Sequence, residues 1–248
     1  MKQQSRERVS IKSAIKGMGG LGYQRLAHVP KTSFADNSMC VIIPSRDEYL
    51  HNRFVQALNG LAYTMNQKRA MFFVTGAEVG QAYDDQVADI LAHPELGQWK
   101  YILTIEDDTL PPPDAVLRLV ESIELGPFDG VGGMYFTKGE LNMPMAYGDP
   151  EEYARTGVLD FRPRDIRQAL ARGQVMEVNG IAMGCSLYRT ETFRRFPRPW
   201  FQTLNEVGVG AATQDLFWCA KTRRDGARFA VDMRVCCAHA DWATNTLY

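Results

Sequence analysis

The stretch YILTIEDDTLPPPD, residues 101–114, joins a short apolar run to a cluster of acids and then to three consecutive prolines. Residues 101–105 have the composition and length of a buried β-strand. Pro112 and Pro113 suit the first turn of a helix, where a backbone N–H has no intrahelical partner, and Asp114 is a favourable first-turn acid. The stretch therefore predicts a strand, an acidic turn and a helix in succession.

The segments before this stretch repeat the same order of elements. Residues 39–44 and 70–74 are apolar runs of strand character, and apolar residues recur at helical spacing over 46–67 and 79–93. Alternating strands and helices predict an α/β fold with a parallel sheet covered by helices on both faces. Ligands of such sheets bind beyond the carboxyl ends of the strands, so we expect Arg46 and the acid cluster at one edge of the same sheet.

Length and composition favour one compact globular unit preceded by a polar arm. The chain has 248 residues, of which 45% are hydrophobic, enough for a sizeable core. The net charge of -1 favours neither a strong nucleic-acid binder nor an acidic disordered chain. Residues 1–33 contain seven lysines and arginines against the single acid Glu7, so we predict a basic flexible arm over 1–37 and a single domain over 38–248.

The start of the chain and its cysteines bear on the cellular compartment. The first residues lack the apolar core of a secretion signal, and no apolar run approaches the roughly 20 residues that span a bilayer. The five cysteines are odd in number and form no C-x-x-C pair, which fits reduced thiols. We therefore expect a soluble cytoplasmic protein, located in the host-cell cytoplasm if it is viral.

Two short motifs suggest functions that we disfavour. In CCAH, residues 236–239, neighbouring cysteines of a strand would point to opposite faces, so buried thiols are a better interpretation than a zinc site. GMGGLG, residues 17–22, matches the dinucleotide fingerprint, but no convincing strand precedes it. A mobile arm is therefore favoured over a dehydrogenase.

The acid cluster is the strongest chemical signal in the sequence. Glu106 and Asp108 alternate onto one face of an extended strand end, where like charges repel unless water or a cation compensates. Carboxylates suit Mg²⁺ or Mn²⁺, which usually also bind substrate phosphates. The magnesium site of a phosphate-loop NTPase would need G-x-x-x-x-G-K-[ST], which this sequence lacks. A solvated turn remains the alternative.

Three segments together resemble a known family, glycosyltransferases of the GT-A fold: VIIPSRD (41–47), YILTIEDDTLPPPDAVLRLV (101–120) and TQDLFWCAKTRRDG…AVDMRVCCAH (213–239). The resemblance is nearest to family-2-like enzymes, including small stand-alone versions in phages and bacteria, and it covers most of residues 39–240. It implies a GT-A (Rossmann-like) sheet with a nucleotide-sugar-binding half, 38–136, and an irregular acceptor and catalytic half, 137–248.

The resemblance also implies an activity and a cofactor. It predicts that a sugar passes from a nucleotide-sugar donor, with a UDP-sugar as the first candidate, to an acceptor hydroxyl by an inverting mechanism. Glu106 and Asp108 match the D-x-D motif of the family, and His239 matches a late histidine that often completes the metal site. These three residues are therefore the predicted ligands of a divalent cation, Mn²⁺ or Mg²⁺; a core histidine is the alternative for His239.

The remaining site residues are carried over from the family by position. Asp215 matches the second acid of the family's E-D motif, the general base of inverting members, although a helix first-turn acid is the alternative. The predicted acceptor-side residues are Gly184, Trp200 and Gln214. The predicted donor-side residues are Pro44, Ser45, Arg46, Glu106, Asp107 and Asp108. A core position for Trp200 and a plain surface position for Arg46 are the structural alternatives.

The sequence departs from the family at three positions. Glu106 replaces the usual first aspartate of the D-x-D motif, and Gln214 replaces the usual glutamate before Asp215. After the second predicted strand, Glu78 is the only acid that could read the nucleobase of the donor. The inverting mechanism and the base of the nucleotide therefore stay open.

Two other functions share these features. A nucleotidyltransferase that joins a sugar phosphate to a nucleoside triphosphate would use the same sheet and acids. A protein that binds a nucleotide sugar or glycan without turnover fits the glutamine at position 214. The acceptor is also open, because a sugar, a lipid, a protein or a hydroxymethylated DNA base would each present a hydroxyl; the basic arm makes DNA a candidate. The oligomeric state is not predicted.

Overall fold

The computed structural model describes residues 36–46, 48–65, 67–206 and 210–248, and Asp36–Tyr248 form one compact unit. The predicted arm lies outside the described residues except for its last two positions, and so does GMGGLG. The division of the domain at residues 136 and 137 stays a prediction.

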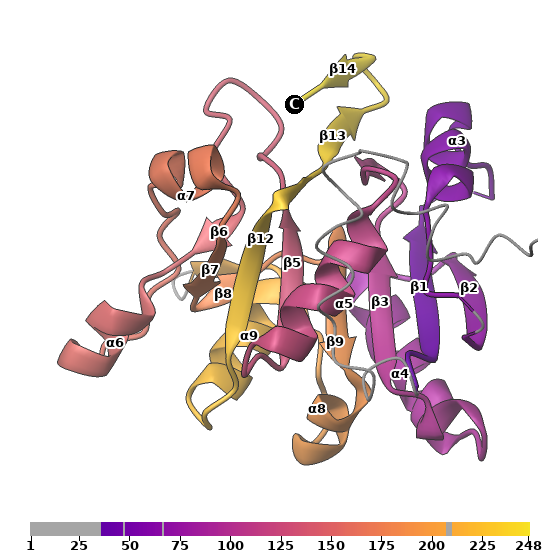
Figure 1. Ribbon diagram of the computed structural model, residues 1–248, viewed down its shortest axis with the longest axis horizontal. Helices are drawn as coiled ribbons and strands as arrows, with labels where there is room; N and C mark the ends of the chain where they lie inside the picture. Colours follow the sequence, from indigo (N-terminus) through magenta and orange to yellow (C-terminus); the bar gives the residue numbers. More distant parts are fainter. Residues whose placement is uncertain (1–35, 47, 66, 207–209) are drawn as a thin grey trace, which may run out of the picture. The chain divides into compact units, whose positions relative to one another are not determined.

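A seven-stranded sheet forms the centre of this unit, with the strand order β2-β1-β3-β9-β5-β12-β7 (Figure 1). Strands β2, β1, β3, β5 and β12 run in one direction, whereas β9 and β7 run in the opposite direction. The predicted α/β class is confirmed, and the mostly parallel sheet flanked by helices is consistent with a Rossmann-like GT-A fold. The strands are β1 (Met39–Ser45), β2 (Arg69–Thr75), β3 (Tyr101–Ile105), β5 (Gly130–Met134), β7 (Val175–Val178), β9 (Cys185–Arg189) and β12 (Phe229–Cys236).

Helices cover both faces of the sheet because side chains of a strand alternate between them. In β1, Cys40 and Ile42 belong to the core cluster that includes Tyr83 of α4 (Val79–Ala92), Phe193 of α8 (Thr190–Arg195) and Trp218 of α9 (Gln214–Arg223). Val41 and Ile43 belong to the opposite cluster, with residues of α3 (Asn52–Gly60) and α5 (Ala115–Leu125). Full burial of one such large apolar side chain stabilises the fold by about 1.5–3 kcal/mol.

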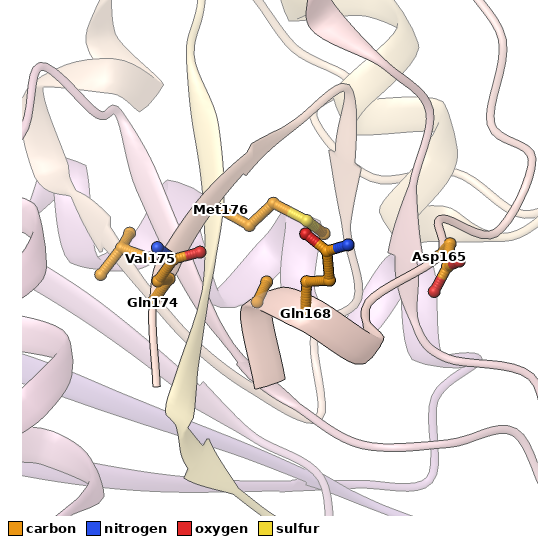
Figure 2. A pocket seen from close by; sticks show the side chains of 6 residues that line it. Asp165, Gln168, Gln174, Val175 and Met176 are labelled. Carbon is orange, nitrogen blue, oxygen red and sulfur yellow. The ribbon is translucent and has the colours of Figure 1, made fainter. Parts of the chain in front are cut away.

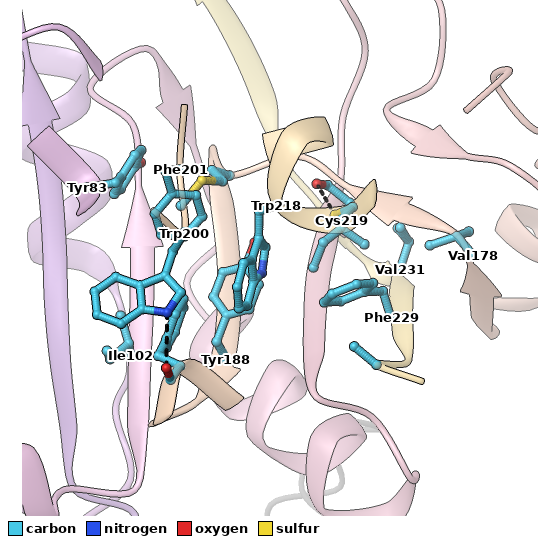
Figure 3. Packing of buried hydrophobic residues seen from close by; sticks show 14 of the residues in the cluster. Tyr83, Ile102, Val178, Tyr188, Trp200, Phe201, Trp218, Cys219, Phe229 and Val231 are labelled. Atoms are coloured by element: carbon cyan, nitrogen blue, oxygen red, sulfur yellow. Dashed lines mark hydrogen bonds between the residues drawn. The ribbon is translucent and has the colours of Figure 1, made fainter. Parts of the chain in front are cut away.

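The cluster beneath α8 and α9 is rich in aromatic rings (Figure 3). The rings of Phe193 and Trp218 are stacked with centroids 5.0 Å apart. Trp200 packs beside them, and its Nε1–H donates to the carbonyl oxygens of Phe193 at 3.0 Å and Phe196 at 2.7 Å. This buried block holds the start of α9 against the sheet.

Two helix boundaries differ from the sequence expectation. The helix predicted over 46–67 spans only Asn52–Gly60: His51 Nδ1 accepts from the Arg53 amide at its start, and Leu61 is extended. Met65, which fitted the helical spacing, is 83% exposed and lies beyond the helix. The helix after the prolines starts at Ala115, with Asp114 at its N-cap position.

Small sheets and short helices complete the unit. At the carboxyl edge of the main sheet, β4 (Thr109–Leu110) pairs with β13 (Ala238–Asp241), which pairs with β14 (Thr246–Leu247) (Figure 1). Strand β13 therefore packs directly on the acidic turn, and β14 extends this small sheet on the far side of β13. The other elements are η1 (Leu96–Gln98), β6 (Ala146–Tyr147), α6 (Pro150–Thr156), α7 (Arg167–Arg172), β8 (Gly180–Ile181), β10 (Leu204–Glu206) and β11 (Gly210–Ala212).

All five cysteines are free thiols, and Cys236 alone is exposed. Within the described part of the chain, no helix combines the length and the apolar character needed to cross a membrane.

Candidate active site

A cavity of about 840 Å³ opens at the carboxyl ends of β1, β2 and β3. We call it the edge cavity. All the predicted donor-side residues line it, as expected if the strand ends meet at one edge of the sheet. Their role in donor binding stays a prediction. The edge cavity is lined by Pro44, Ser45, Arg46, Gly76, Ala77, Glu78, Val79, Glu106, Asp107, Asp108, Lys138, Gln214, Asp241, Trp242 and Ala243.

Backbone hydrogen bonds fix the acidic turn after β3. The amide of Glu106 donates to the carbonyl oxygen of Gly184 at 3.0 Å. The carbonyl oxygen of Asp108 accepts from the amide of Ala240 at 2.7 Å, and that of Asp107 accepts from Trp242 Nε1 at 3.1 Å. The turn is therefore held by the residue before β9 on one side and by the C-terminal hairpin on the other.

The carboxylates of this turn have different electrostatic surroundings. The pKa of Glu106 is raised well above its ordinary value, because burial disfavours its charged form and because Asp108, Asp215 and Asp107 repel it. Burial alone would raise the pKa of Asp108 too, but the Lys138 ammonium group, which donates to this carboxylate, and the adjacent His239 ring outweigh burial and lower that pKa. The negative charge of Asp108 is thus offset by its neighbours, whereas that of Glu106 is not.

His239 lies next to Asp108, although the two are far apart in the sequence. Its Nδ1 is 2.7 Å from the carbonyl oxygen of Phe136, an acceptor, so we assign the ring proton to Nδ1. Its Nε2 is 3.6 Å from Asp108 Oδ2. In the neutral ring, a nitrogen lone pair and a carboxylate oxygen therefore face each other, which favours a cation between them.

The donor atoms present fit a divalent cation that is shared with a bound ligand. Asp108 Oδ1 is buried without a hydrogen-bond partner, so this carboxylate has unused capacity. Over the described residues, no group of three or more His, Cys, Asp or Glu side chains is arranged to hold a metal ion. Mg²⁺ typically uses one or two carboxylates and completes its shell with water and substrate phosphates. Asp108 and His239 suit that kind of site.

Lys138 is a cation that the sequence analysis did not single out. It follows β5 in the chain, and its Nζ is 2.5 Å from Asp108 Oδ2. Nothing in its local sequence distinguishes it from a surface lysine. Arg46 also lines the edge cavity, which thus has two cationic side chains. Arg46 is exposed and forms no ion pair with another described residue.

The start of α9 presents Gln214, not Asp215, to the edge cavity. Gln214 Nε2 is 3.5 Å from Glu106 Oε1. Asp215 is 5% exposed, accepts from the Leu216 amide at 2.8 Å and from the Thr213 hydroxyl, and does not line the cavity. Burial raises the pKa of Asp215 in spite of these hydrogen bonds. Its role as a base stays a prediction.

The two other predicted acceptor-side residues are buried. Gly184 lies directly behind the acidic turn, where a Cβ atom would come within 2.4 Å of Thr109 Oγ1 and 2.5 Å of the Tyr135 hydroxyl, so close packing explains this glycine. Trp200 is 6% exposed and belongs to the aromatic core rather than to the cavity (Figure 3). Its ring and its N–H are both used inside the core, the structural alternative for this residue, and its place beside an acceptor stays a prediction.

Two further residues line the edge cavity: Trp242, which the sequence did not indicate, and Glu78, which it suggested only as a reader of the nucleobase. The Trp242 ring stacks on His51, with centroids 3.8 Å apart and planes 14° apart. Glu78, considered above as a nucleobase reader, caps α4 by accepting from the Gln81 amide at 3.1 Å and accepts from the Thr203 hydroxyl at 2.7 Å. Trp242 follows a short strand near the end of the chain, where no pattern indicated a site.

A second, smaller hollow of about 290 Å³ lies between α7 and β7 (Figure 2). Gln168 of α7 and Met176 of β7 face each other across it. Its only acid is Asp165, which is paired with Arg167 at 2.5 Å. This hollow contains no cluster of reactive side chains and is separate from the acidic turn.

Comparison with known proteins gives structural matches only. No protein-family model and no curated protein sequence matches the chain. The fold is similar to the crystal structure of A197 from STIV, with a TM-score of 0.57 and 15% identity over 85% of this chain and 92% of that one. It also matches the catalytic domain of Drosophila β1,4-galactosyltransferase 7 in complex with xylobiose, with a TM-score of 0.44 and 12% identity over 79% of this chain and 65% of that one.

At such identities, the likeness to A197 shows the fold alone. The match to the galactosyltransferase is too distant to support an argument about this chain. The predicted likeness to family 2 in particular stays a prediction.

Proposed function

We propose that this protein is a glycosyltransferase that moves a sugar from a nucleotide-sugar donor to an acceptor hydroxyl in the edge cavity. The observation that carries the proposal is the meeting of Asp108 and His239, which are far apart in the sequence, at a cavity that also contains the cations Arg46 and Lys138. The cavity, about 840 Å³, is within the usual size range of ligand sites. Its position beyond the carboxyl strand ends is typical of nucleotide sites in α/β sheets.

Asp108 and His239 would hold a divalent cation, Mn²⁺ or Mg²⁺, with Glu106 as a further candidate ligand. When bound, such a cation supplies positive charge that stabilises the leaving diphosphate. Arg46 offers a planar, bidentate donor that suits phosphate oxygens. Ser45 donates to Asp107 Oδ2 at 2.6 Å and so keeps the segment after β1 next to the acidic turn.

Asp215 is our candidate for the base that accepts the proton of the acceptor hydroxyl. A carboxyl with a raised pKa is better matched to proton transfer near neutral pH than an ordinary one. This role fits an inverting mechanism and requires the bound acceptor to bring its hydroxyl to Asp215, which does not itself line the edge cavity. Replacement by Asn would then lower kcat and remove the acidic limb of the pH profile of kcat/KM.

A screen of donors and acceptors tests the proposed function. The full chain is incubated with Mn²⁺, a panel of nucleotide sugars, and both hydroxymethylated DNA and simple glycans, and the products are weighed by mass spectrometry. Glycosyl transfer predicts a free nucleoside diphosphate and an acceptor heavier by one sugar residue. Release of pyrophosphate from a nucleoside triphosphate and a sugar phosphate would instead identify a nucleotidyltransferase, and donor binding without any product would identify a binding protein.

A further inference from the structure

We propose that Lys138 is an internal counter-ion that pairs with Asp108 when no ligand is bound, yields this carboxylate to a divalent cation, and then binds the diphosphate of the donor. This inference rests on the proposed function, because it assumes a donor that carries a diphosphate. It assigns to Lys138 a binding role that depends on which ligand is present.

Lys138 and a cation bound by Asp108 and His239 would need the same oxygen atom. Lys138 Nζ lies 2.5 Å from Asp108 Oδ2. His239 Nε2, the other candidate ligand, is 3.6 Å from that same Oδ2, whereas Oδ1 has no hydrogen-bond partner. A cation held jointly by Asp108 and His239 through Oδ2 therefore cannot coexist with the ammonium group in its present position.

The side chain of Lys138 can move without unfolding its loop. The loop between β5 and β6 is closed by the Thr137 amide, which donates to the Met143 carbonyl at 2.8 Å, and by the Met145 amide, which donates to the Tyr135 carbonyl at 2.9 Å. The backbone is thus anchored, while a lysine has a flexible stem of four carbons. The side chain is 34% exposed, so no packed core holds it in place.

The edge cavity is lined by more acids than cations: Glu78, Glu106, Asp107, Asp108 and Asp241, against Arg46 and Lys138. A diphosphate brings further negative charge into this acidic cavity, and its oxygens are strong acceptors for charge-assisted hydrogen bonds. The displaced ammonium group and the guanidinium of Arg46 are the side chains that can offset this charge.

Binding measurements on variants of the full chain test the inference. Lys138→Met removes the charge but keeps the length of the stem. Arg46→Gln removes a cation of the same cavity that does not contact Asp108, and Lys68→Gln removes an exposed lysine paired with Glu95 at 2.7 Å outside the cavity. For each, the affinity for Mn²⁺ alone is measured by paramagnetic resonance, and that for inorganic pyrophosphate at saturating Mn²⁺ by calorimetry.

The two affinities of the Lys138 variant are expected to change in opposite directions. Mn²⁺ alone should bind about fivefold tighter, because a partly exposed ion pair of roughly 1 kcal/mol no longer competes for Asp108. Pyrophosphate should bind about tenfold weaker, because one charge-assisted contact is lost. Arg46→Gln should weaken pyrophosphate binding but change Mn²⁺ affinity less than about twofold, and Lys68→Gln should change neither.

Three results would overturn the inference. They are Mn²⁺ affinity that is unchanged or weaker in Lys138→Met, an equal gain of Mn²⁺ affinity in Arg46→Gln, and pyrophosphate affinity that does not depend on Lys138. Absence of Mn²⁺ binding in every variant would also overturn it. Because no sugar is transferred in these measurements, such a failure is separate from the product screen, which decides the proposed function by itself.

Discussion

Two acids lie near the two ends of strand β3, Glu124 of α5 at its start and Glu106 at its end, and their pKa values are shifted in opposite directions. At the start of the strand, Glu124 of α5 accepts from the Tyr101 hydroxyl at 2.5 Å and pairs with Lys100 at 2.9 Å and Arg189 at 3.0 Å. Burial would raise the pKa of Glu124, but these partners outweigh it and lower that pKa. At the end of the same strand, burial and neighbouring acids raise the pKa of Glu106 well above its ordinary value.

This contrast separates charge that stabilises the fold from charge that is available to a ligand. A buried carboxylate with several donors contributes to folding, whereas a carboxylate among like charges opposes it. Ionisable groups with strongly perturbed pKa values in a cavity are typical of functional sites. Removing the carboxylate of Glu124 and that of Glu106 in separate variants should therefore change the free energy of unfolding in opposite directions.

The largest change in the free energy of unfolding is expected from Glu124→Gln. It leaves Lys100 and Arg189 without their carboxylate partner, so unfolding at neutral pH should require about 2 kcal/mol less, as measured by urea denaturation. Because the pKa of Glu124 is lower in the folded state than its ordinary value of 4.5, its contribution is complete above pH 4.5 and is lost as the pH falls through the folded-state pKa. The difference in unfolding free energy between wild type and Glu124→Gln should therefore become smaller below pH 4.5.

Glu95→Gln provides the matched control for Glu124→Gln. Glu95 also pairs with a lysine, Lys68, but both side chains are more than half exposed. Its removal should leave the free energy of unfolding nearly unchanged, because an exposed ion pair contributes little to stability. Equal losses of unfolding free energy in Glu124→Gln and Glu95→Gln would show that the ion pairs of Glu124 stabilise the fold no more than an exposed pair does.

The opposite sign is expected from Glu106→Gln at the other end of the strand. Removing this charge relieves its repulsion from Asp108 and Asp215, so the variant should be more stable than wild type by on the order of 1 kcal/mol at neutral pH. Urea denaturation without added metal measures the difference. Destabilisation of similar size would contradict the contrast between the two ends.

The smallest effect is expected from Trp242→Phe. Phenylalanine keeps a ring to stack on His51 but loses the N–H that donates to the Asp107 carbonyl at 3.1 Å. The loss should be about 0.5–1 kcal/mol in the free energy of unfolding, the net value of one hydrogen bond. Trp242→Ala, which also removes the stack, should be less stable than Trp242→Phe; identical stabilities would show that the ring does not support the acidic turn.

The sequence predicted the sheet and its ligand edge because these follow from local patterns. Strand–helix alternation and the carboxyl-end rule brought Arg46, Glu106 and Asp108 together, and the structure places them around one cavity. The position of His239 beside Asp108 followed from a family resemblance, since nothing in its local sequence indicates it.

Other features depend on tertiary packing, and the sequence could not indicate them. Lys138 and Trp242 reach the cavity through a loop and a C-terminal hairpin that carry no periodic pattern. Trp200 was assigned to the acceptor side from the family resemblance, with a core position as the alternative, and its hydrogen bonds to the carbonyl oxygens of Phe193 and Phe196 favour the core position.

The central claim is that the acidic end of β3 performs sugar transfer, and turnover of two variants tests it most directly. Using the donor and acceptor found in the product screen, the rate of acceptor glycosylation is measured for wild type, Asp108→Asn and Glu124→Gln at a temperature where all three are folded. We predict that Asp108→Asn loses about 10³-fold in rate or more, whereas Glu124→Gln transfers sugar at the wild-type rate. Wild-type turnover by Asp108→Asn would contradict the account.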